Sequence, residues 1–489
     1  MKSMVLRAIA LILCVSTLLL SSCIKINGPS SDEAETTTDD TTDAQSETDY
    51  DYVIVENDFL KEQRYYLNSL GNADFEGSTV LIATPSPALI DEDSALPAMS
   101  KEIEYRKRDL KNKFNVELAS KTVDPDTLYT SVYNACLAND YFADLLMIPQ
   151  YYILQYVTSG ILFNMNSLPF TDFDSGYNIE TGTEAAQALS SAWAVASWTT
   201  LDPGGLPAVF FNKELASECG LEDPYKLVKN GKWTWDAFFE YCEALDGLNE
   251  KRNAEGLAAV RSYGAQNTSV VLSDIVYFSE GNRFVTAGLG NYPAIALDPA
   301  ASGHTAGTLQ RLFNDANKET NAIGAIDAFA SGSSLFLIDR LETMKSIAAS
   351  DAVWGVLPIP KKDTEQEKYI SLAPSDTLFF AIPANCTGSE KVSRTMSCLN
   401  VLSLGYCVDA YLTDSMYYYL RDNESISSVE KICYGVTYDM AYTAGSYDDA
   451  IPNSTYFAIR NVYENNHEVS FYTDAYSYAA SAALTRLFS

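Results

Sequence analysis

The sequence at residues 78–87, Ser-Thr-Val-Leu-Ile-Ala-Thr-Pro-Ser-Pro, predicts a buried strand that ends in a loop. A continuous apolar run of this kind is typical of a strand covered on both faces, as in a parallel α/β sheet. Apolar residues at helical spacing follow between 99 and 114, and Asn115 is expected to close that helix. Apolar runs at 116–118 and 144–149 repeat the order strand, helix, strand. The sequence therefore predicts an α/β fold built from βαβ units.

Patterns further along the chain continue this alternation. Helix starts are expected at Asp223, whose carboxylate precedes a proline at the first helical position, and at Thr234. Apolar strands are expected at 334–338, 354–358 and 378–383. The chain has 489 residues, 47% of them hydrophobic, which is enough for two sizeable lobes.

A resemblance to a known family rests on residues 205–236. The segment reads Gly-Leu-Pro-Ala-Val-Phe-Phe-Asn-Lys-Glu-Leu at 205–215 and Gly-Lys-Trp-Thr-Trp-Asp at 231–236. Shorter matches occur in the expected order at 139–144, 329–332 and 354–361. Together they resemble the bacterial extracellular solute-binding proteins of family 1, the sugar-binding lipoproteins of ABC importers. The resemblance spans roughly residues 76–405 and is weak beyond them.

The resemblance implies a two-lobed periplasmic-binding-protein-like fold of type II, with the lobes joined by hinge strands and a ligand cleft between them. By analogy, lobe 1 would hold residues 76–206 and 332–403, and lobe 2 would hold residues 207–331 and 404–489. Ligand would bind between the lobes, closure would bury it, and the membrane subunits of an ABC permease would recognise the closed form. A monomeric binding protein without enzymatic activity is expected.

The N-terminus indicates export. A basic start, an apolar run from Ala8 to Leu20 and small residues after it predict a secretory signal over 1–22. The Leu-Ser-Ser-Cys sequence ending at Cys23 resembles the lipobox of bacterial lipoproteins, in which this thiol carries diacylglycerol and the protein gains further acyl chains such as palmitate. An ordinary signal peptide with a chance cysteine is the alternative. Residues 23–75 are predicted to form a flexible acidic tether that holds the protein on the extracellular face of the cell membrane.

Charge and composition narrow the partners. A formal charge of −32, from 65 acidic and 33 basic residues, disfavours nucleic acid, anionic lipid headgroups and acidic ligands. On charge alone, an acidic surface that only aids solubility is an equal explanation. Two histidines and no Cys-x-x-Cys pair give poor support for a metal site, a cofactor or a Ser-His-Asp triad. The seven cysteines beyond Cys23 are expected to be buried free thiols.

Ligands of open α/β sheets bind beyond the carboxyl ends of the strands. This rule predicts ligand contacts in the loops after two strands and before the crossover between lobes, at Thr84, Ser86, Gln150, Tyr151, Trp198 and Asp202. The resemblance adds a region of lobe 2 where the family often carries cleft residues, at Asp274, Tyr277, Glu280 and Asn282. Trp354 is assigned to the cleft and to the core with equal weight.

A sugar offers an apolar face for an aromatic ring and hydroxyl groups for carboxylates and amides. Trp198 and Tyr151 are the preferred aromatic candidates, whereas Trp233 and Trp235 are expected to pack in the core of lobe 2. Three alternatives stay open: a surface-anchored glycoside hydrolase with two carboxylates, a binding module of a sensor, and a binding protein for non-sugar solutes.

Overall fold

A computed structural model describes residues 58–173, 175–188, 191–265, 271–287, 293–315, 318, 322–350, 352–445, 447–465 and 469–488. The chain divides into a unit Met1–Gly71 and a unit Asn72–Ser489. In the first unit, the described residues form helix α2 (Asp58–Ser69). The predicted tether therefore extends too far, because residues 58–69 are rich in helix-forming Leu, Lys, Glu, Gln and Arg rather than in Ser and Thr. Cys23 and the signal segment lie outside the described residues.

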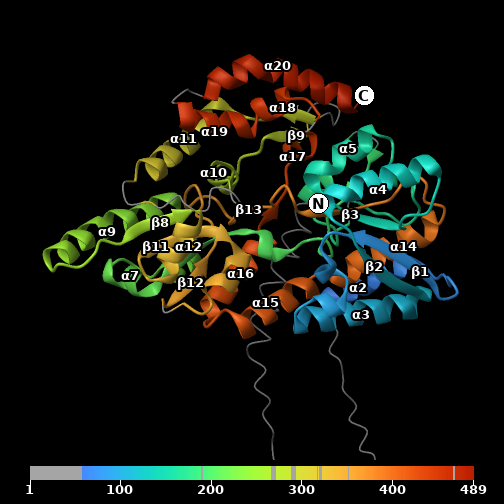
Figure 1. The fold of residues 1–489 in the computed structure, drawn as a ribbon, viewed down its shortest axis with the longest axis horizontal. Coiled ribbons are helices and arrows are strands. Elements are labelled where there is room, and N and C mark those ends of the chain that lie inside the picture. Colours follow the sequence, from blue (N-terminus) through green and yellow to red (C-terminus); the bar gives the residue numbers. More distant parts are fainter. Residues whose placement is uncertain are drawn as a thin grey trace, which may run out of the picture. The chain divides into compact units, whose positions relative to one another are not determined.

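The five-stranded sheet of the second unit, called the first sheet, has the strand order β2-β1-β3-β14-β6. Strand β1 pairs in parallel with β2 and β3, and β14 pairs antiparallel with β3 and β6. Its strands are β1 (Ser78–Thr84), β2 (Val116–Thr122), β3 (Leu145–Pro149), β6 (Ala194–Val195) and β14 (Leu378–Ala381). The βαβ order predicted from residues 78–149 is thus present (Figure 1).

Several helices lie between or after the strands of the first sheet along the chain: α3 (Pro97–Phe114), α4 (Pro125–Ala138), α5 (Ile153–Thr158), α6 (Glu180–Ala185), α14 (Ser389–Ser403) and α15 (Tyr406–Tyr418). Asn115 closes α3 as predicted, because its left-handed backbone (φ 50°) directs its N–H to the carbonyl of Lys111. A short hairpin of β4 (Gln187–Ala188) and β5 (Ser191–Ala192) precedes β6.

The four-stranded sheet, called the second sheet, has the order β12-β7-β11-β8. Its strands are β7 (Pro207–Asn212), β8 (Arg261–Ala265), β11 (Ser334–Arg340) and β12 (Trp354–Leu357). Strands β11 and β12 both pair antiparallel with β7. The predicted lobe boundary at residue 332 therefore does not follow the sheets, since it assigns β11 and β12 to the lobe of the first sheet. Sequence order alone does not reveal that these strands return to β7.

Helices between the strands of the second sheet are α7 (Lys213–Glu218), α8 (Pro224–Lys229), α9 (Trp235–Ala254), α12 (Ala322–Ala330) and α13 (Met344–Ile347). Asp223 caps α8 by accepting the N–H of Tyr225, and Thr234 caps α9 by accepting the N–H of Ala237, as predicted. Trp233 and Trp235 are 0% and 1% exposed, so both belong to the core, as expected. Helix α16 (Asn423–Tyr434) packs against β12.

The remaining elements include α10 (Leu272–Ser279), β9 (Val285–Ala287), β10 (Pro293–Ile295) and α11 (Pro299–Asn314). The C-terminal helices, as we call them, are α17 (Met440–Ala444), α18 (Ala450–Asn453), α19 (Tyr456–Asn465) and α20 (Val469–Phe488). Helices α18, α19 and α20 pack on one another (Figure 1). Helix α20 also packs against β10. Within the described part of the chain, no helix is both long and apolar enough to cross a membrane.

A small parallel ribbon connects the two sheet regions. Strand β13 (Ser371–Leu372) lies on the segment between β12 and β14, and β15 (Val436–Thr437) lies between α16 and α17. The two strands pair in parallel, with Ser371 opposite Val436. Gly435 allows this approach, because a Cβ at that position would collide with the main-chain carbonyls of Tyr369 and Lys431. Segments far apart in sequence thus meet where the chain passes from one sheet to the other.

Candidate ligand-binding cleft

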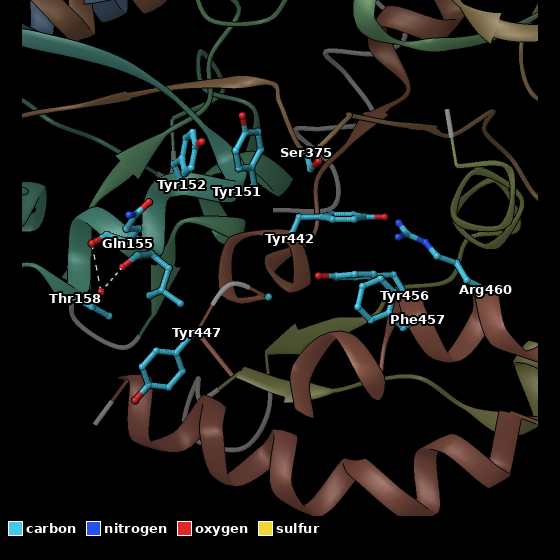
Figure 2. A pocket seen from close by; sticks show the side chains of 12 residues that line it. Tyr151, Tyr152, Gln155, Thr158, Ser375, Tyr442, Tyr447, Tyr456, Phe457 and Arg460 are labelled. Carbon is cyan, nitrogen blue, oxygen red and sulfur yellow. Dashed lines mark hydrogen bonds between the residues drawn. The ribbon is translucent and has the colours of Figure 1, made fainter. Parts of the chain in front are cut away.

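Two adjoining compartments form the candidate site. The larger has a volume of about 720 Å³ and the smaller about 340 Å³. These volumes fall in the range of small-molecule sites, about 300–1,000 Å³. Four residues line both compartments, namely Tyr151, Ser375, Tyr442 and Arg460. The two compartments therefore adjoin and form one cleft. The remaining residues of the larger compartment are Tyr152, Leu154, Gln155, Thr158, Gly445, Tyr447, Tyr456 and Phe457 (Figure 2).

One wall of the cleft follows directly from the end of β3. The chain turns into a short 3-10 helix at Gln150–Tyr152, and the N–H of Tyr151 donates to the carbonyl of Ser375 at 3.1 Å. The rings of Tyr151 and Tyr152 lie 4.3 Å apart at an interplanar angle of 52°. The hydroxyl of Tyr152 donates to Asp126 at 2.8 Å, and this hydrogen bond, followed by burial, raises the pKa of Tyr152 to about 12. Burial also raises the pKa of Tyr151.

The opposite wall comes from α17 and α19. The rings of Tyr442 and Tyr456 stack at 5.3 Å with an interplanar angle of 12°, and Figure 2 shows them parallel to one another. Phe457 lies next to this pair, with its ring centroid 4.8 Å from that of Tyr456, and is 38% exposed. Gly445 permits the stack, because a Cβ there would lie 2.5 Å from the hydroxyl of Tyr456. The wall therefore offers aromatic surface to a ligand.

A buried ion pair fixes this wall to α10. The Nη2 of Arg460 donates to Asp274 Oδ2 at 2.6 Å, its Nε donates to Oδ1 at 3.2 Å, and the hydroxyl of Tyr442 donates to Oδ2 at 2.7 Å. The side chain of Asp274 is only 2% exposed, and that of Arg460 is 27% exposed. Although burial opposes its charge, the Asp274 carboxylate holds the pKa of Arg460 above its usual value. Burial raises the pKa of Tyr442 well above normal, so this phenol stays protonated.

A second ion pair lines the smaller compartment. The Nη1 of Arg340, at the end of β11, donates to Asp376 Oδ2 at 3.1 Å. Two cationic side chains line the cleft, and each pairs with a carboxylate that also lines it: Arg340 with Asp376, and Arg460 with Asp274. The charges of these pairs cancel, and their remaining lone pairs and N–H groups suit a polar, uncharged ligand.

The floor of the smaller compartment consists of segments that cross between the sheets. Gly205 lies on the connection from β6 to β7 and Pro207 begins β7, while Leu372 ends β13 and Ala373 and Pro374 follow it. The N–H of Ala373 donates to the carbonyl of Thr437 at 2.8 Å, which links this floor to β15. Movement of one sheet region relative to the other would therefore change the shape of the cleft.

Tyr151 and Asp274 are the predicted site residues that line the two described compartments. Gln150 lies behind the wall, since it is fully buried and its Nε2 donates to the carbonyl of Asp439 and to Thr443 Oγ1. Thr84 is also fully buried; its hydroxyl donates to the carbonyl of the half-buried Ser86 and accepts the N–H of Ser86 in a local turn. Gln150, Thr84 and Ser86 therefore lie at the carboxyl ends of their strands, as the rule for ligand-contacting loops requires, but they do not line the described cleft.

The residues before the crossover and in β12 also lie outside these compartments. Trp198 is half-buried and packs against Tyr434 at 5.4 Å, so it is not the predicted platform of this cleft. Asp202 is exposed and caps the turn at Pro203–Gly205 by accepting the N–H of Gly204. Trp354 packs against Phe210 and donates its Nε1 hydrogen to the carbonyl of Ile347, which favours its assignment to the core.

The other residues predicted from the resemblance support the cleft from behind. Tyr277 is 1% exposed and donates to the carbonyl of Arg283. The buried Glu280 carboxylate accepts hydrogen bonds from Thr305 and Thr308 and lies 2.9 Å from Nδ1 of His304, and Asn282 donates to Thr305. These groups satisfy one another within the α10–α11 region, which explains their burial without a ligand.

Several lining residues were missed by the sequence reasoning, namely Tyr442, Tyr456, Phe457, Arg460, Arg340 and Asp376. The signal for four of them was the Tyr-rich C-terminal third, whose role the sequence left open. Phe457 and Arg460 follow Tyr456 at spacings of one and four, which places an aromatic ring and a cation on adjacent helical turns. Nothing in the sequence indicated that this helix reaches Asp274.

Metal and cysteine chemistry give no candidate centre in the described part of the chain. No group of three or more His, Cys, Asp or Glu side chains there is arranged to hold a metal ion. The seven cysteines from Cys136 to Cys433 are free thiols, four buried and three half-buried.

Comparison with solved structures establishes the fold class. The chain is similar to the GacH receptor of Streptomyces glaucescens GLA.O, with 14% sequence identity, a TM-score of 0.50 and coverage of 84% of this chain and 99% of that one. That receptor was crystallised unliganded and in complex with acarbose and an acarbose homolog, and was compared with acarbose-loaded maltose binding protein of Salmonella typhimurium. The protein therefore has the predicted α/β fold of the periplasmic-binding-protein type. No family model matches the sequence, and a search of curated proteins finds no match.

Proposed function

We propose that this protein is an extracellular solute-binding protein that takes a sugar into the cleft between its two sheet regions and delivers it to an ABC import permease. The observation that carries the proposal is the combination of an aromatic wall, Tyr442, Tyr456 and Phe457, with two closed arginine–carboxylate pairs in one cleft. Aromatic rings suit the apolar faces of sugars, and paired charges suit hydroxyl groups. The binding of acarbose by a receptor of similar fold adds support.

Lipidation of Cys23 and tethering to the extracellular face of the cell membrane belong to the same proposal and rest on the lipobox-like sequence alone. A tether raises the local concentration near the permease, so that a weak docking contact suffices. Comparing membrane and soluble fractions of the wild-type chain and Cys23→Ser tests this part. We expect the wild type to be in the membrane fraction and the variant to be released; equal membrane retention of both would contradict lipidation at Cys23.

Sugar binding is tested with the protein purified from residue 24 onward. Thermal shift against acarbose and a panel of mono- and oligosaccharides should identify a stabilising ligand, because saturation at a hundred times Kd adds about 2.7 kcal/mol. Chromatography of the incubated sugars then separates binding from catalysis. Stabilisation without products supports the proposal, and cleavage products would favour the glycoside hydrolase. No shift with any glycan would refute a sugar ligand for this cleft.

Tyr151→Ala locates the binding event. Tyr151 lines both compartments, so loss of its ring should weaken sugar binding by about tenfold, which corresponds to about 1.4 kcal/mol. Tyr417→Ala is the matched control, since Tyr417 is 80% exposed on α15 and lines neither compartment. Isothermal titration calorimetry should give wild-type affinity for the control. Equal affinities for all three proteins would place the sugar elsewhere.

A further inference from the structure

The ion pair of Arg340 and Asp376 connects the two sheet regions at the smaller compartment. Arg340 ends β11 of the second sheet, and its Nη1 and Nη2 donate to Oδ2 and Oδ1 of Asp376 at 3.1 and 3.4 Å. Asp376 precedes β14 of the first sheet, on a segment fixed to the first wall by the hydrogen bond from the N–H of Tyr151 to the carbonyl of Ser375. The Asp376 carboxylate thus occupies the pair of N–H donors at the end of this guanidinium.

The guanidinium of Arg460 is occupied in a similar way. Its Nε and Nη2 both donate to the carboxylate of Asp274, at 3.2 and 2.6 Å. The group also lies over the rings of Tyr456 and Phe457, at 4.8 and 5.4 Å from their centroids. Figure 2 shows it directed toward the hydroxyl of Tyr442. A carboxylate and aromatic rings therefore already hold this cation before any ligand enters.

The charges along the cleft are balanced. Among the described residues that line the two compartments, the charged side chains are the two arginines and two aspartates of these pairs. A ligand carboxylate would find no unpaired cation among them and would lie beside a carboxylate of the same sign, which disfavours its binding. The formal charge of −32 on the whole chain acts in the same direction. A neutral sugar does not meet this repulsion.

We propose that Asp376 is a specificity-determining residue, which makes the cleft select neutral sugars over sugars that carry a carboxylate by occupying the N–H donors of Arg340. Asp274 does the same for Arg460. The inference rests on the proposed sugar-binding function for its test with sugars, and on the structure alone for its test with a simple anion.

Asp376 is the better of the two aspartates to substitute. Its side chain is 50% exposed, whereas that of Asp274 is 2% exposed and holds the second wall in place. Asp376→Asn keeps the size of the side chain and removes its charge. Arg340 then offers its N–H donors to another carboxylate, which a guanidinium binds through two parallel hydrogen bonds. The variant should therefore accept acidic ligands that the wild type rejects.

Asp236→Asn is the matched control. It changes the charge of the chain by the same amount and removes a carboxylate that also pairs with an arginine, since Asp236 lies 2.8 Å from Nη1 of Arg311. Neither residue of that pair lines the described compartments. A change in specificity that arises only from the total charge would appear in this variant too.

The first experiment compares sugars that differ in one carboxylate. Calorimetry at pH 7.5 measures the affinity of the wild type, Asp376→Asn and Asp236→Asn for maltotriose, cellobiose and α-1,4-galactobiose, and for each sugar after oxidation of C6 to a carboxylate. We expect the wild type and Asp236→Asn to bind a neutral sugar about tenfold or more tightly than its oxidised form, and this ratio to fall about tenfold in Asp376→Asn. An effect of the substitution on both forms alike cancels in the ratio. Equal affinity of the wild type for both forms, or an unchanged ratio in Asp376→Asn, would overturn the proposal.

The second experiment needs no sugar and separates the two proposals. Melting temperatures of the same three proteins are measured in sodium acetate and in sodium chloride at equal concentration. Acetate should replace the missing carboxylate beside Arg340, so its stabilisation relative to chloride should be about 1 °C larger in Asp376→Asn than in the other two proteins. If none of the neutral sugars binds but this difference occurs, the sugar assignment fails and the charge selection by Asp376 stands. An equal effect of acetate on all three proteins refutes that role.

Discussion

The two walls of the cleft differ in how they relate to the sheets that support them. Tyr151 follows β3 by two residues, so its position is set by the strand itself. Tyr442, Tyr456 and Arg460 belong to helices near the C-terminus and reach their places through contacts with α10, more than 150 residues earlier, as in the 168-residue separation of Tyr442 and Asp274. The first wall is a local consequence of the sheet, and the second depends on long-range polar contacts.

This difference shows where the site is vulnerable. A wall that continues from a strand keeps its geometry as long as the sheet folds. A wall built from separate helices needs its own anchors, which here are the Asp274–Arg460 pair and the capping carboxylate of Asp439. Substitutions at the anchors should therefore affect the second wall far more than any equivalent change on the first.

The largest expected effect is that of Asp274→Ala. The substitution leaves Arg460 and the hydroxyl of Tyr442 without their shared acceptor in a buried setting, so the free energy of unfolding should fall by about 3–5 kcal/mol. Urea denaturation measures the loss. The matched control is Asp376→Ala, which breaks the pair with Arg340 from a side chain that is 50% exposed and should cost about 1 kcal/mol or less. Equal losses for the two variants would contradict the distinction between a buried anchor and an exposed one.

Trp198→Ala tests a residue that the sequence assigned to the cleft and the structure does not. Trp198 packs against Tyr434 outside both compartments, so its truncation should lower the stability of the free protein by about 3 kcal/mol. Sugar affinity at a temperature where the variant is folded should stay at the wild-type value. Weak binding together with an unchanged melting temperature would restore the cleft assignment.

The pH dependence of stability reports the cost of burying the charged form of Asp439. A folded-state pKa of about 6, above the usual 3.8, means that the folded protein binds this proton more readily than the unfolded chain. The contribution of Asp439 to stability is therefore present below pH 4 and lost as the pH rises through 6, by about 2 kcal/mol between pH 4 and 7.

Urea denaturation of the wild type and Asp439→Asn between pH 4 and 7 measures this contribution. It is the difference between the two proteins in how the free energy of unfolding changes with pH. The variant should lose less stability than the wild type as the pH rises. Parallel curves for the two proteins would show that Asp439 titrates equally in the folded and unfolded states.

The smallest effect is expected from Gly445→Ala. The backbone of Gly445 is in an ordinary helical conformation (φ −64°), so the added methyl acts only by contact with the Tyr456 hydroxyl at 2.5 Å and the Ala441 carbonyl at 2.8 Å. Displacement of Tyr456 should cost about 1 kcal/mol and weaken sugar binding. Gly307→Ala on α11 is the control, because its Cβ meets open space and should stabilise the helix. A stabilised Gly445→Ala variant with normal affinity would mean that Tyr456 can shift freely.

Much of the fold could be predicted, because local physical chemistry decides it. The apolar run at 78–84, the cap at Asn115 and the capped helices after Asp223 and Thr234 depend on neighbours in sequence, and all of them are present. Which strands pair with one another could not be predicted in this way. The boundary at residue 332 did not follow the sheets because β11 and β12 pair with β7, and a buried apolar strand has no local feature that names its partner.

The site divides in the same way. Tyr151 could be located because the end of a strand and the edge of a sheet are linked by the chain itself. Tyr442, Tyr456 and Arg460 could not, because a tyrosine on a helix has the same local pattern whether it faces a cleft or a core. By itself, the sequence determined the α/β class, the position of Tyr151 after β3 and the resemblance that suggests a sugar. Only the tertiary structure decided the second wall, since the burial of Asp274 beside Arg460 arises from packing between segments that are distant along the chain.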